Sequence, residues 1–192
     1  AGWPQRQTTV HEELGRSLSD IRKGMTGFAP RVDAPSVDVV IPVFNAPALT
    51  QRCIESVISY LGSSIQAIHI QDDASGIETA TMLEHLSSPI LHVVHAPENQ
   101  GYGASVNEAL ARSKADFVLV LNSDTELLEN ILPPLCKALL ADPKLAVISP
   151  VHQDYKFRLD RYHRQPGGYV LTYRFQGYGF LIRRQLFNAL GG

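Results

Sequence analysis

Short apolar runs and segments with helical spacing alternate along the chain from Val37 onward. Runs rich in Val, Ile and Leu predict β-strands, and apolar residues that return every three or four positions predict amphipathic helices. The expected strands are residues 37–44, 66–70, 90–96, 117–122 and 145–150, and the expected helical segments are residues 45–62, 72–88, 104–114 and 133–142.

The first expected helix carries markers along its whole length. Apolar residues recur every four positions from Leu49 through Cys53 to Leu61. Pro47 stands near its start and Gly62 at its end, which are the positions these residues favour at helix termini.

This alternation predicts an α/β fold with a Rossmann-like, mostly parallel sheet and helices on both faces. Right-handed crossovers place the strand-to-helix loops on one edge of such a sheet, and ligands bind there, outside the carboxyl ends of the strands. Four loops should therefore meet at one site: Phe44-Asn45, Asp72-Asp73, Asn99 to Gly103, and Asn122 to Asp124.

The two flanks differ from the middle of the chain. Residues 1–34 combine a short amphipathic pattern with a Gly- and Pro-rich run, so we expect a leader and linker before a domain over residues 35–192. Residues 152–168 are polar, basic and aromatic, which indicates a functional loop or a disordered one. A strand over residues 168–182 and a short helix over residues 183–192 should follow.

Composition places the chain among soluble globular proteins, since 44% of residues are hydrophobic and 19% are charged. No apolar run approaches the ~20 residues of a membrane span, and the N-terminal residues show no signal-like apolar core. The expected location is the cytoplasm or the inner face of the membrane. Cys53 and Cys136 fall in helical segments, where we expect small core residues rather than a disulfide.

The net charge of −2 is unevenly distributed. Acidic side chains outnumber basic ones in residues 35–150, and the balance reverses in residues 151–192. The basic end could contact a phosphate-bearing ligand or a membrane surface as a peripheral protein does, although charge alone favours a plain solvated surface. The basic residues form no dense stripe, so nucleic acid is not an expected partner.

Asp124 follows directly on a buried strand. A carboxylate at such a place must be solvated, hydrogen-bonded or bound to a metal ion. It could cap the turn together with Asn122, Ser123 or Thr125, or it could hold a divalent cation, because Mg²⁺ takes only one or two carboxylates besides substrate phosphates.

Asp72 and Asp73 end the second expected strand. Ser75 and Glu78 have the spacing of a capping box, so one acid belongs to the local turn. The other carboxylate is free to accept a hydrogen bond from a ligand such as a nucleobase, and we favour Asp73 for that role.

The segment NQGYGASVN indicates a glycine loop before a helix. It fails the GxGxxG pattern, because Val106 stands where the third glycine should be, and no Walker A sequence occurs. Gly101 and Gly103 allow a close approach to a ligand beside a helix N-terminus, or they serve a tight turn. No nucleophile elbow is present, and His92 and His95 point to opposite faces of a strand.

Four segments in this order resemble family 2 glycosyltransferases of the GT-A fold: VVIPVFNAP, IQDDAS, NQGYGASVNEALARSKADFVLVLNSDTE and GYGFLIRRQLFNALGG. The resemblance covers residues 37–192, and its NSD motif is most similar to that of rhamnosyltransferase-like enzymes of bacterial surface glycans. It implies transfer of a sugar from a nucleotide-diphosphate sugar to a glycan or lipid-linked acceptor in polysaccharide biosynthesis.

The resemblance also implies roles for single residues. Asp124 would bind the divalent cation, Mg²⁺ or Mn²⁺, and Asn107 would support the glycine loop. The nucleotide-sugar would lie against Pro42, Phe44, Asn45, Asp73, Asn99, Gly101, Gly103, Asn122 and Ser123. The acceptor side would hold Gly177, Gly179, Phe180, Arg183 and Arg184.

The implied mechanism inverts the sugar and depends on the metal ion. Relatives supply the catalytic base from acidic residues that would lie beyond Gly192, so no base is named here and a C-terminally truncated domain is expected. The alternative is a non-catalytic nucleotide-sugar-binding or scaffold module of the same fold. A nucleotidyltransferase or a Rossmann oxidoreductase is disfavoured, because VFNAPALT lacks the glycine-rich loop that both need after the first strand.

Overall fold

The computed structural model describes residues 35–151, 169–170 and 176–189. The expected leader over residues 1–34 and the basic segment over residues 152–168 lie outside these described residues. The helices and strands in chain order are β1 (Val37–Val43), α2 (Pro47–Leu61), β2 (Ala67–Asp72), α3 (Ile77–His85), β3 (Leu91–His95), α4 (Tyr102–Arg112), β4 (Phe117–Leu121), α5 (Leu132–Ala141), β5 (Val147–Ile148), β6 (Gly179–Arg183) and α6 (Arg184–Ala189).

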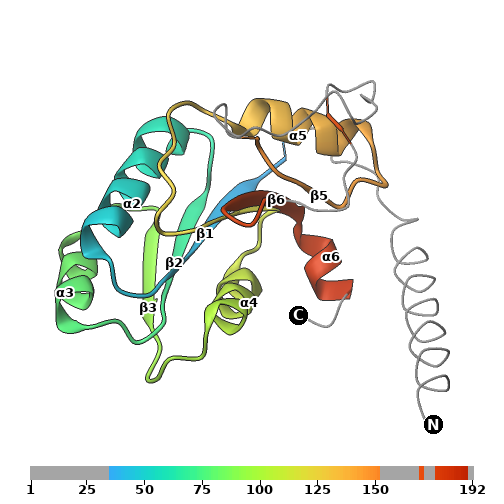
Figure 1. Ribbon diagram of the computed structural model, residues 1–192. Coiled ribbons are helices and arrows are strands. Elements are labelled where there is room, and N and C mark those ends of the chain that lie inside the picture. Colours follow the sequence, from blue (N-terminus) through green and yellow to red (C-terminus); the bar gives the residue numbers. More distant parts are fainter. Residues whose placement is uncertain (1–34, 152–168, 171–175, 190–192) are drawn as a thin grey trace, which may run out of the picture.

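A six-stranded sheet in the order β3-β2-β1-β4-β6-β5 forms the centre of the described structure (Figure 1). β1 pairs in parallel with β2 on one side and β4 on the other, and β3 continues the parallel part beyond β2. β6 runs antiparallel to both β4 and β5. The prediction of a mostly parallel α/β sheet is therefore confirmed.

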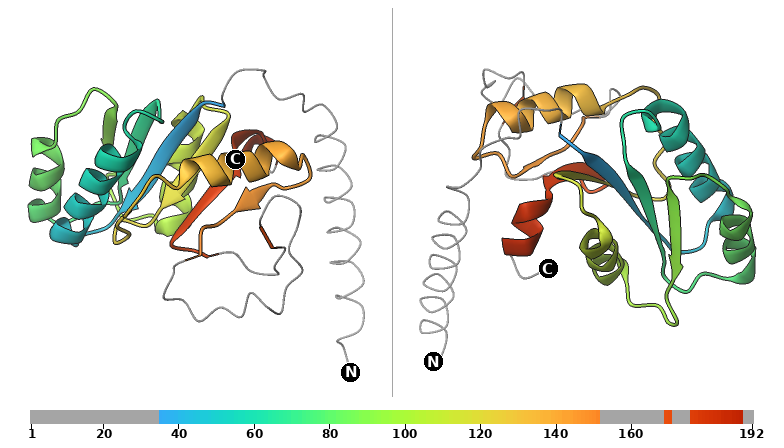
Figure 2. Two further views of the ribbon diagram at one scale, coloured as in Figure 1. Left: turned by 90° about the horizontal axis from the view of Figure 1, so that it is seen from above. Right: turned by 180° about the vertical axis from the view of Figure 1, so that it is seen from behind.

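Helices cover both faces of the sheet, as Figure 2 shows from two further directions. Val39, Ile41 and Val43 of β1 face α2, α3 and α5, and they belong to the larger core cluster. Val40 points to the opposite face, where it packs with side chains of α4, β4, β6 and α6 in a second cluster. This alternation follows from the two-residue period of a strand, and it explains why strands buried on both faces are almost wholly apolar.

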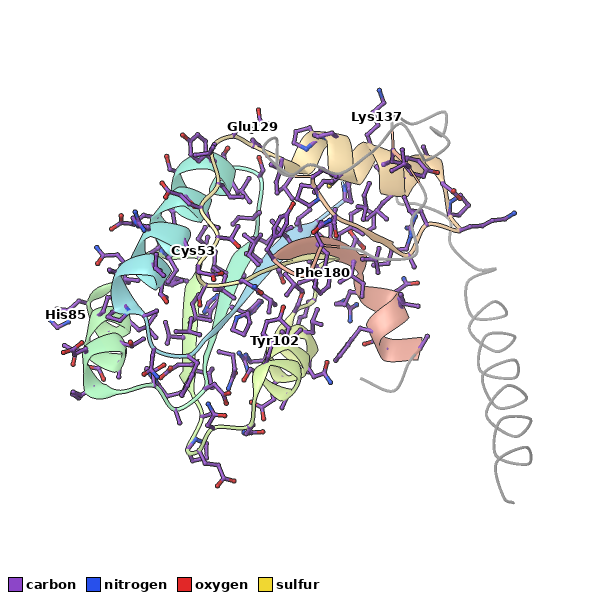
Figure 3. All side chains as sticks on the ribbon, viewed as in Figure 1. Cys53, His85, Tyr102, Glu129, Lys137 and Phe180 are labelled. Carbon is purple, nitrogen blue, oxygen red and sulfur yellow. The ribbon has the colours of Figure 1, made fainter. Side chains whose placement is uncertain are left out.

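Helix α2 begins and ends where the sequence predicts. Pro47 is its first residue, and the Gly62 N–H at its C-terminus donates to the Ile58 carbonyl at 3.1 Å. Cys53 and Leu61 are fully buried, and Figure 3 shows the Cys53 side chain between α2 and the sheet. Leu49 does not continue this buried stripe, because 40% of it is exposed beside the cleft described below.

A buried polar group joins β1, β2 and α4 at the amino end of the sheet. The Asp38 carboxylate accepts from Ser113 Oγ at 2.7 Å and lies 3.3 Å from His69 Nε2. Burial alone would raise the pKa of Asp38, but the hydrogen bonds of His69 and Ser113 outweigh burial and lower it. The His69 and His92 rings stack at 5.6 Å, so these histidines are part of the packing between β2 and β3.

None of the described helices has the length and apolar character that crossing a bilayer requires.

Arg183 is buried at the amino end of the sheet. It pairs with Phe117 at the amino end of β4, across the sheet from the carboxyl ends where a ligand would bind. Its buried guanidinium donates to the carbonyls of Leu139, Asp142 and Leu145, at the end of α5 and the start of β5. Arg183 thus ties α5 and β5 to β6, and the expectation that it lies on the acceptor side stays a prediction that these contacts do not favour.

We predict that Arg183→Ala lowers the free energy of unfolding by about 2–4 kcal/mol, because it leaves buried carbonyls without their charged donor. Urea unfolding followed by circular dichroism measures this loss. Arg52→Ala, which removes an exposed arginine of α2, is the control and should change stability by less than about 0.5 kcal/mol. An equal, small effect of both substitutions would contradict the structural role of Arg183.

Candidate functional site

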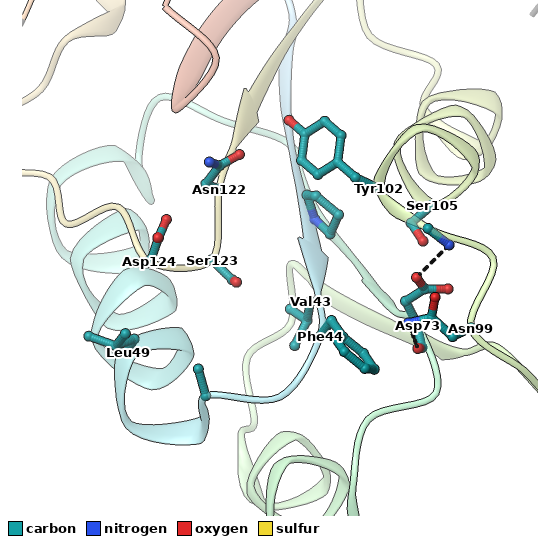
Figure 4. A pocket seen from close by; sticks show the side chains of 13 residues that line it. Val43, Phe44, Leu49, Asp73, Asn99, Tyr102, Ser105, Asn122, Ser123 and Asp124 are labelled. Carbon is teal, nitrogen blue, oxygen red and sulfur yellow. Dashed lines mark hydrogen bonds between the residues drawn. The ribbon is translucent and has the colours of Figure 1, made fainter.

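A cleft of about 470 Å³ opens at the carboxyl ends of β1, β2 and β4, beside the N-terminus of α4 (Figure 4). The sheet topology creates it: the chain leaves β1 toward β2 on one side, whereas β4 returns on the other, so a crevice forms between their ends. Its lining residues are Pro42, Val43, Phe44, Ala46, Leu49, Asp73, Asn99, Gly101, Tyr102, Ser105, Asn122, Ser123 and Asp124.

The four loops that were expected at this edge all contribute to the lining. The cleft has two different ends in Figure 4: Asp73, Asn99 and Ser105 lie at one, Asp124 lies at the other, and Phe44 lies between them. The structure thus brings most of the predicted nucleotide-sugar residues together, while their roles in binding stay predictions.

The Asp73 carboxylate fixes the loop that precedes α4. One oxygen accepts from the Gln100 N–H and the other from the Gly101 N–H, both at 2.8 Å. The Asn99 side-chain amide donates to the Asp73 carbonyl at 3.3 Å. Gly101 has φ +87°, which a residue with a side chain rarely adopts, and it is the N-cap of α4. Asp73 is only 4% exposed, so its first task is to hold this loop.

The neighbouring Asp72 belongs to the local turn, as expected for one of the two acids. Its carboxylate accepts from the Ser75 N–H at 3.2 Å and lies 2.7 Å from His95 Nδ1, which joins the ends of β2 and β3. The predicted capping box is wrong, because no side chain caps α3 and Ser75 Oγ instead accepts from the Asn45 N–H.

Asn45 therefore has a structural position rather than a place in the cleft lining. Its side-chain oxygen accepts from the Gly76 N–H at 2.9 Å, and its φ is +60°. These contacts join the loop after β1 to the loop after β2. Asn45 is not among the lining residues, so its expected contact with the nucleotide stays a prediction.

The turn from Asn122 to Thr125 is held from two sides. The Asn122 N–H donates to the Tyr178 carbonyl at 2.9 Å, and Thr125 Oγ1 donates to the same carbonyl at 3.1 Å. On the side of α2, the Cys53 thiol donates to the Asn122 carbonyl at 3.5 Å. The turn is thus positioned by α2 and by the segment before β6.

Asp124 offers a carboxylate that no described residue meets with a hydrogen bond, and its side chain is exposed in the cleft. The Asn122 side-chain oxygen is buried, also without a partner among the described residues. Carboxylate and amide oxygens are ligands that Mg²⁺ and Mn²⁺ accept, so this donor set fits a divalent cation that shares its remaining positions with a ligand. The described residues hold no cluster of three His, Cys, Asp or Glu side chains that could bind a metal alone.

Several other predicted residues lie outside the lining. Gly103 and Asn107 are exposed on α4, and Gly177 is exposed before β6. A Cβ on Gly179 would lie 2.9 Å from Leu121 Cδ2, so Gly179 permits close packing of β6 on β4. Arg184 donates to the Ala115 carbonyl at 2.8 Å, just before the amino end of β4 and away from the cleft.

Tyr102 and Ser105 line the cleft although neither was named as a site residue from the sequence. Both lie in the first turn of α4, one helical turn apart, so they share a face of the helix. Burial raises the pKa of Tyr102, whose ring is half exposed. The sequence contained one signal for these two residues. Positions 102 and 105 are three apart directly after Gly101, so they share one face of a helix that begins there.

The cleft is acidic. Asp73 and Asp124 are its two titratable carboxylates, and no lysine, arginine or histidine appears among the lining residues of the described structure. A ligand with a phosphate group therefore finds no positive side chain there, although the N–H groups and hydroxyls can still donate to it.

A model of the family described as "Glycosyl transferase family 2" matches residues 38–191. The chain belongs to glycosyltransferase family 2. The resemblance drawn from the motifs is thereby confirmed at the family level, whereas the likeness to rhamnose-transferring enzymes stays a prediction.

Relatives of this family 2 glycosyltransferase include an N-acetylglucosaminyltransferase of Rhizobium sp. (strain N33), which is 31% identical over 115 residues, or 58% of this chain and 25% of that protein. A GalNAc(5)-diNAcBac-PP-undecaprenol beta-1,3-glucosyltransferase of Campylobacter jejuni is 27% identical over 104 residues, or 53% of this chain and 33% of that protein. The chain thus spans a third or less of these curated relatives.

A solved structure has the same fold. The mannosyltransferase PcManGT from Pyrobaculum calidifontis, in complex with GDP-Man and Mn²⁺, matches with a TM-score of 0.67 over 95% of this chain and 56% of that chain. At 20% sequence identity this likeness establishes the GT-A fold of the glycosyltransferase domain and leaves its ligands open.

We predict that Asp73→Ala loosens the loop before α4 in the ligand-free protein. The substitution removes two charge-assisted hydrogen bonds, so it should lower the free energy of unfolding by about 2–4 kcal/mol and speed hydrogen exchange of the Gln100 and Gly101 amides. Asp124→Ala is the matched control, because the described residues give that carboxylate no hydrogen bond to lose. Unchanged exchange in Asp73→Ala would show that the loop does not depend on this carboxylate.

The second prediction for the site concerns Cys53. Burial raises the pKa of its thiol to about 12, so at pH 8 it stays protonated and poorly nucleophilic. A Cys136→Ala variant, which leaves Cys53 as the chain's single thiol, should react slowly with a disulfide reagent at pH 8 and quickly once urea unfolds it. Rapid labelling of the folded variant would mean that α2 does not shield the turn at Asn122.

Proposed function

We propose that the cleft binds a nucleotide-diphosphate sugar together with a divalent cation, and that the domain transfers the sugar to a glycan or lipid-linked acceptor with inversion. The main support for this proposal is that the two carboxylates of the acidic cleft differ in their hydrogen bonding. Asp73 is already hydrogen-bonded through both oxygens, whereas Asp124 is exposed and has no such bond from the described residues.

Charge supports the need for a cation. A diphosphate is anionic, and the lining holds two carboxylates and no cationic side chain. Opposed like charges in a partly desolvated cleft are unfavourable unless a counter-ion lies between them. Asp124 is the carboxylate with free lone pairs for that ion, and the unpartnered Asn122 oxygen lies in the same turn.

The difference between Asp73 and Asp124 also suggests how the donor lies in the cleft. The cation and the diphosphate belong at the Asp124 end, and the nucleoside belongs at the end formed by Asp73, Asn99 and Gly101. Phe44 lies between the two ends and is 54% exposed, so its ring offers an apolar surface to the nucleoside. The solved neighbour, a mannosyltransferase in complex with GDP-Man and Mn²⁺, supports the pairing of a sugar donor with a cation.

Transfer then follows from substitution at the anomeric carbon. An acceptor hydroxyl attacks the anomeric carbon from the face opposite the diphosphate and gives its proton to a carboxylate base. The bond from carbon to the phosphate oxygen breaks, the nucleoside diphosphate leaves, and the anomer inverts. The cation, when bound, neutralises the charge that develops on the departing diphosphate. We assign the base to neither carboxylate of the cleft, because Asp73 holds the loop and Asp124 faces the cation.

The acceptor is proposed on the basis of the relatives. The Campylobacter relative is named for an undecaprenol-linked glycan, and another relative is the succinoglycan biosynthesis protein ExoO of Rhizobium meliloti. A lipid-linked acceptor would bring this domain to the inner face of a membrane as a peripheral protein, which is the proposed location.

We predict that wild-type protein binds at least one donor from a panel of GDP-mannose, UDP-glucose, UDP-N-acetylglucosamine and dTDP-rhamnose when Mn²⁺ is present. Isothermal titration with Mn²⁺ and with EDTA measures the dependence on the cation. Asp124→Ala should weaken Mn²⁺-dependent binding about tenfold or more, because it removes the carboxylate ligand of the ion.

Glu126→Ala is the control, since it removes an exposed acid two residues away that does not line the cleft. It should leave the affinity within about twofold. Binding that is equally strong in EDTA would remove the proposed role of Asp124. Failure of every donor to bind would favour a scaffold module without a donor site.

A further inference from the structure

Ser105 has a buried hydroxyl with no partner among the described residues, and it lines the cleft. The residue is 2% exposed in the first turn of α4. A serine in a helix often donates to the carbonyl four residues earlier, but here the Gly101 carbonyl accepts only from the Ser105 N–H, at 3.1 Å. The hydroxyl is therefore available to something that enters the cleft.

The other buried serines of the described chain provide the comparison. Ser113 Oγ donates to the Asp38 carboxylate at 2.7 Å. Ser56 Oγ donates to the Cys53 carbonyl at 2.8 Å and accepts from the Leu127 N–H at 3.0 Å. The hydroxyls of these two buried serines are thus satisfied by the protein, and an unpaired buried hydroxyl is unfavourable. Ser105 is the exception, and it is also the one that faces the cleft.

The position of Ser105 decides which part of a donor it meets. It lies at the Asp73 end of the cleft, across from Asp124 (Figure 4). The Asp73 carboxylate repels a phosphate from that end, and it already takes up the N–H groups of Gln100 and Gly101 at the start of α4. A neutral group with hydrogen-bonding atoms fits there, because a hydroxyl can both donate and accept.

We propose that the Ser105 hydroxyl hydrogen-bonds to the nucleoside half of the donor and thereby contributes to nucleotide affinity. This inference rests on the proposed function, since it requires a nucleotide-sugar in the cleft. It adds a donor-binding residue in the first turn of α4 to those expected from the motifs, and it assigns that residue to the nucleoside rather than to the transferred sugar.

The test compares Ser105→Ala with wild type by isothermal titration in Mn²⁺. The probes are the tightest-binding donor of the panel and the nucleoside diphosphate that remains when its sugar is removed. Loss of one hydrogen bond should weaken both ligands by the same factor, about fivefold to tenfold. The melting temperature of the ligand-free variant should not fall, because the hydroxyl has no partner to lose and alanine favours a helix.

Ser63→Ala is the matched control, because it makes the same truncation at an exposed serine outside the cleft, and it should leave both affinities unchanged. Equal affinities of wild type and Ser105→Ala would overturn the assignment. So would a loss confined to the sugar-bearing donor. If no donor of the panel binds wild type, the proposed function is wrong and the Ser105 assignment falls with it, which separates the two failures.

Discussion

The two hydrogen bonds onto the Asp73 carboxylate determine the shape and the polarity of the site. They hold Gln100 and Gly101 against the end of β2, and so they bring the first turn of α4 to the edge of the cleft. They also occupy both oxygens of Asp73, whereas the Asp124 carboxylate at the other end of the cleft is exposed. A single local arrangement thus gives the cleft one end that is already satisfied and one that can take a cation.

The fold was predictable because its information is periodic and local. Alternating strands and helices of ordinary length allow few topologies once right-handed crossovers are required, and β1 to β4 appear close to their expected bounds. The convergence of four loops followed from topology alone. The exposure of Leu49 could not be predicted in the same way. Its spacing places it on the apolar face of α2, but spacing does not show which part of that face lies beside the cleft instead of on the sheet.

The contacts that the sequence did not predict join groups that are distant in the sequence. Ser75 has a local capping pattern, yet its hydroxyl serves Asn45, thirty residues away. Arg183 follows a motif but bonds to carbonyls near residue 142. The Tyr178 carbonyl that holds the turn at Asn122 is a backbone group, and backbone groups have no sequence signature. Such contacts depend on three-dimensional register, which single-sequence patterns do not contain.

The polar groups of the cleft are of two kinds: some are hydrogen-bonded within the protein, and others are available to a ligand. Asp73 and Asn99 bond to the protein itself and build the walls. The buried oxygens of Ser105 and Asn122 have no partner among the described residues, and the exposed Asp124 carboxylate accepts no hydrogen bond from them. A folded chain tolerates unpaired buried polar atoms at some loss of stability, and a ligand that pairs them recovers that loss as binding free energy. The unpaired polar atoms of the cleft therefore lower the stability of the ligand-free fold. The hydrogen bonds of Asp73 and Asn99 stabilise the same site.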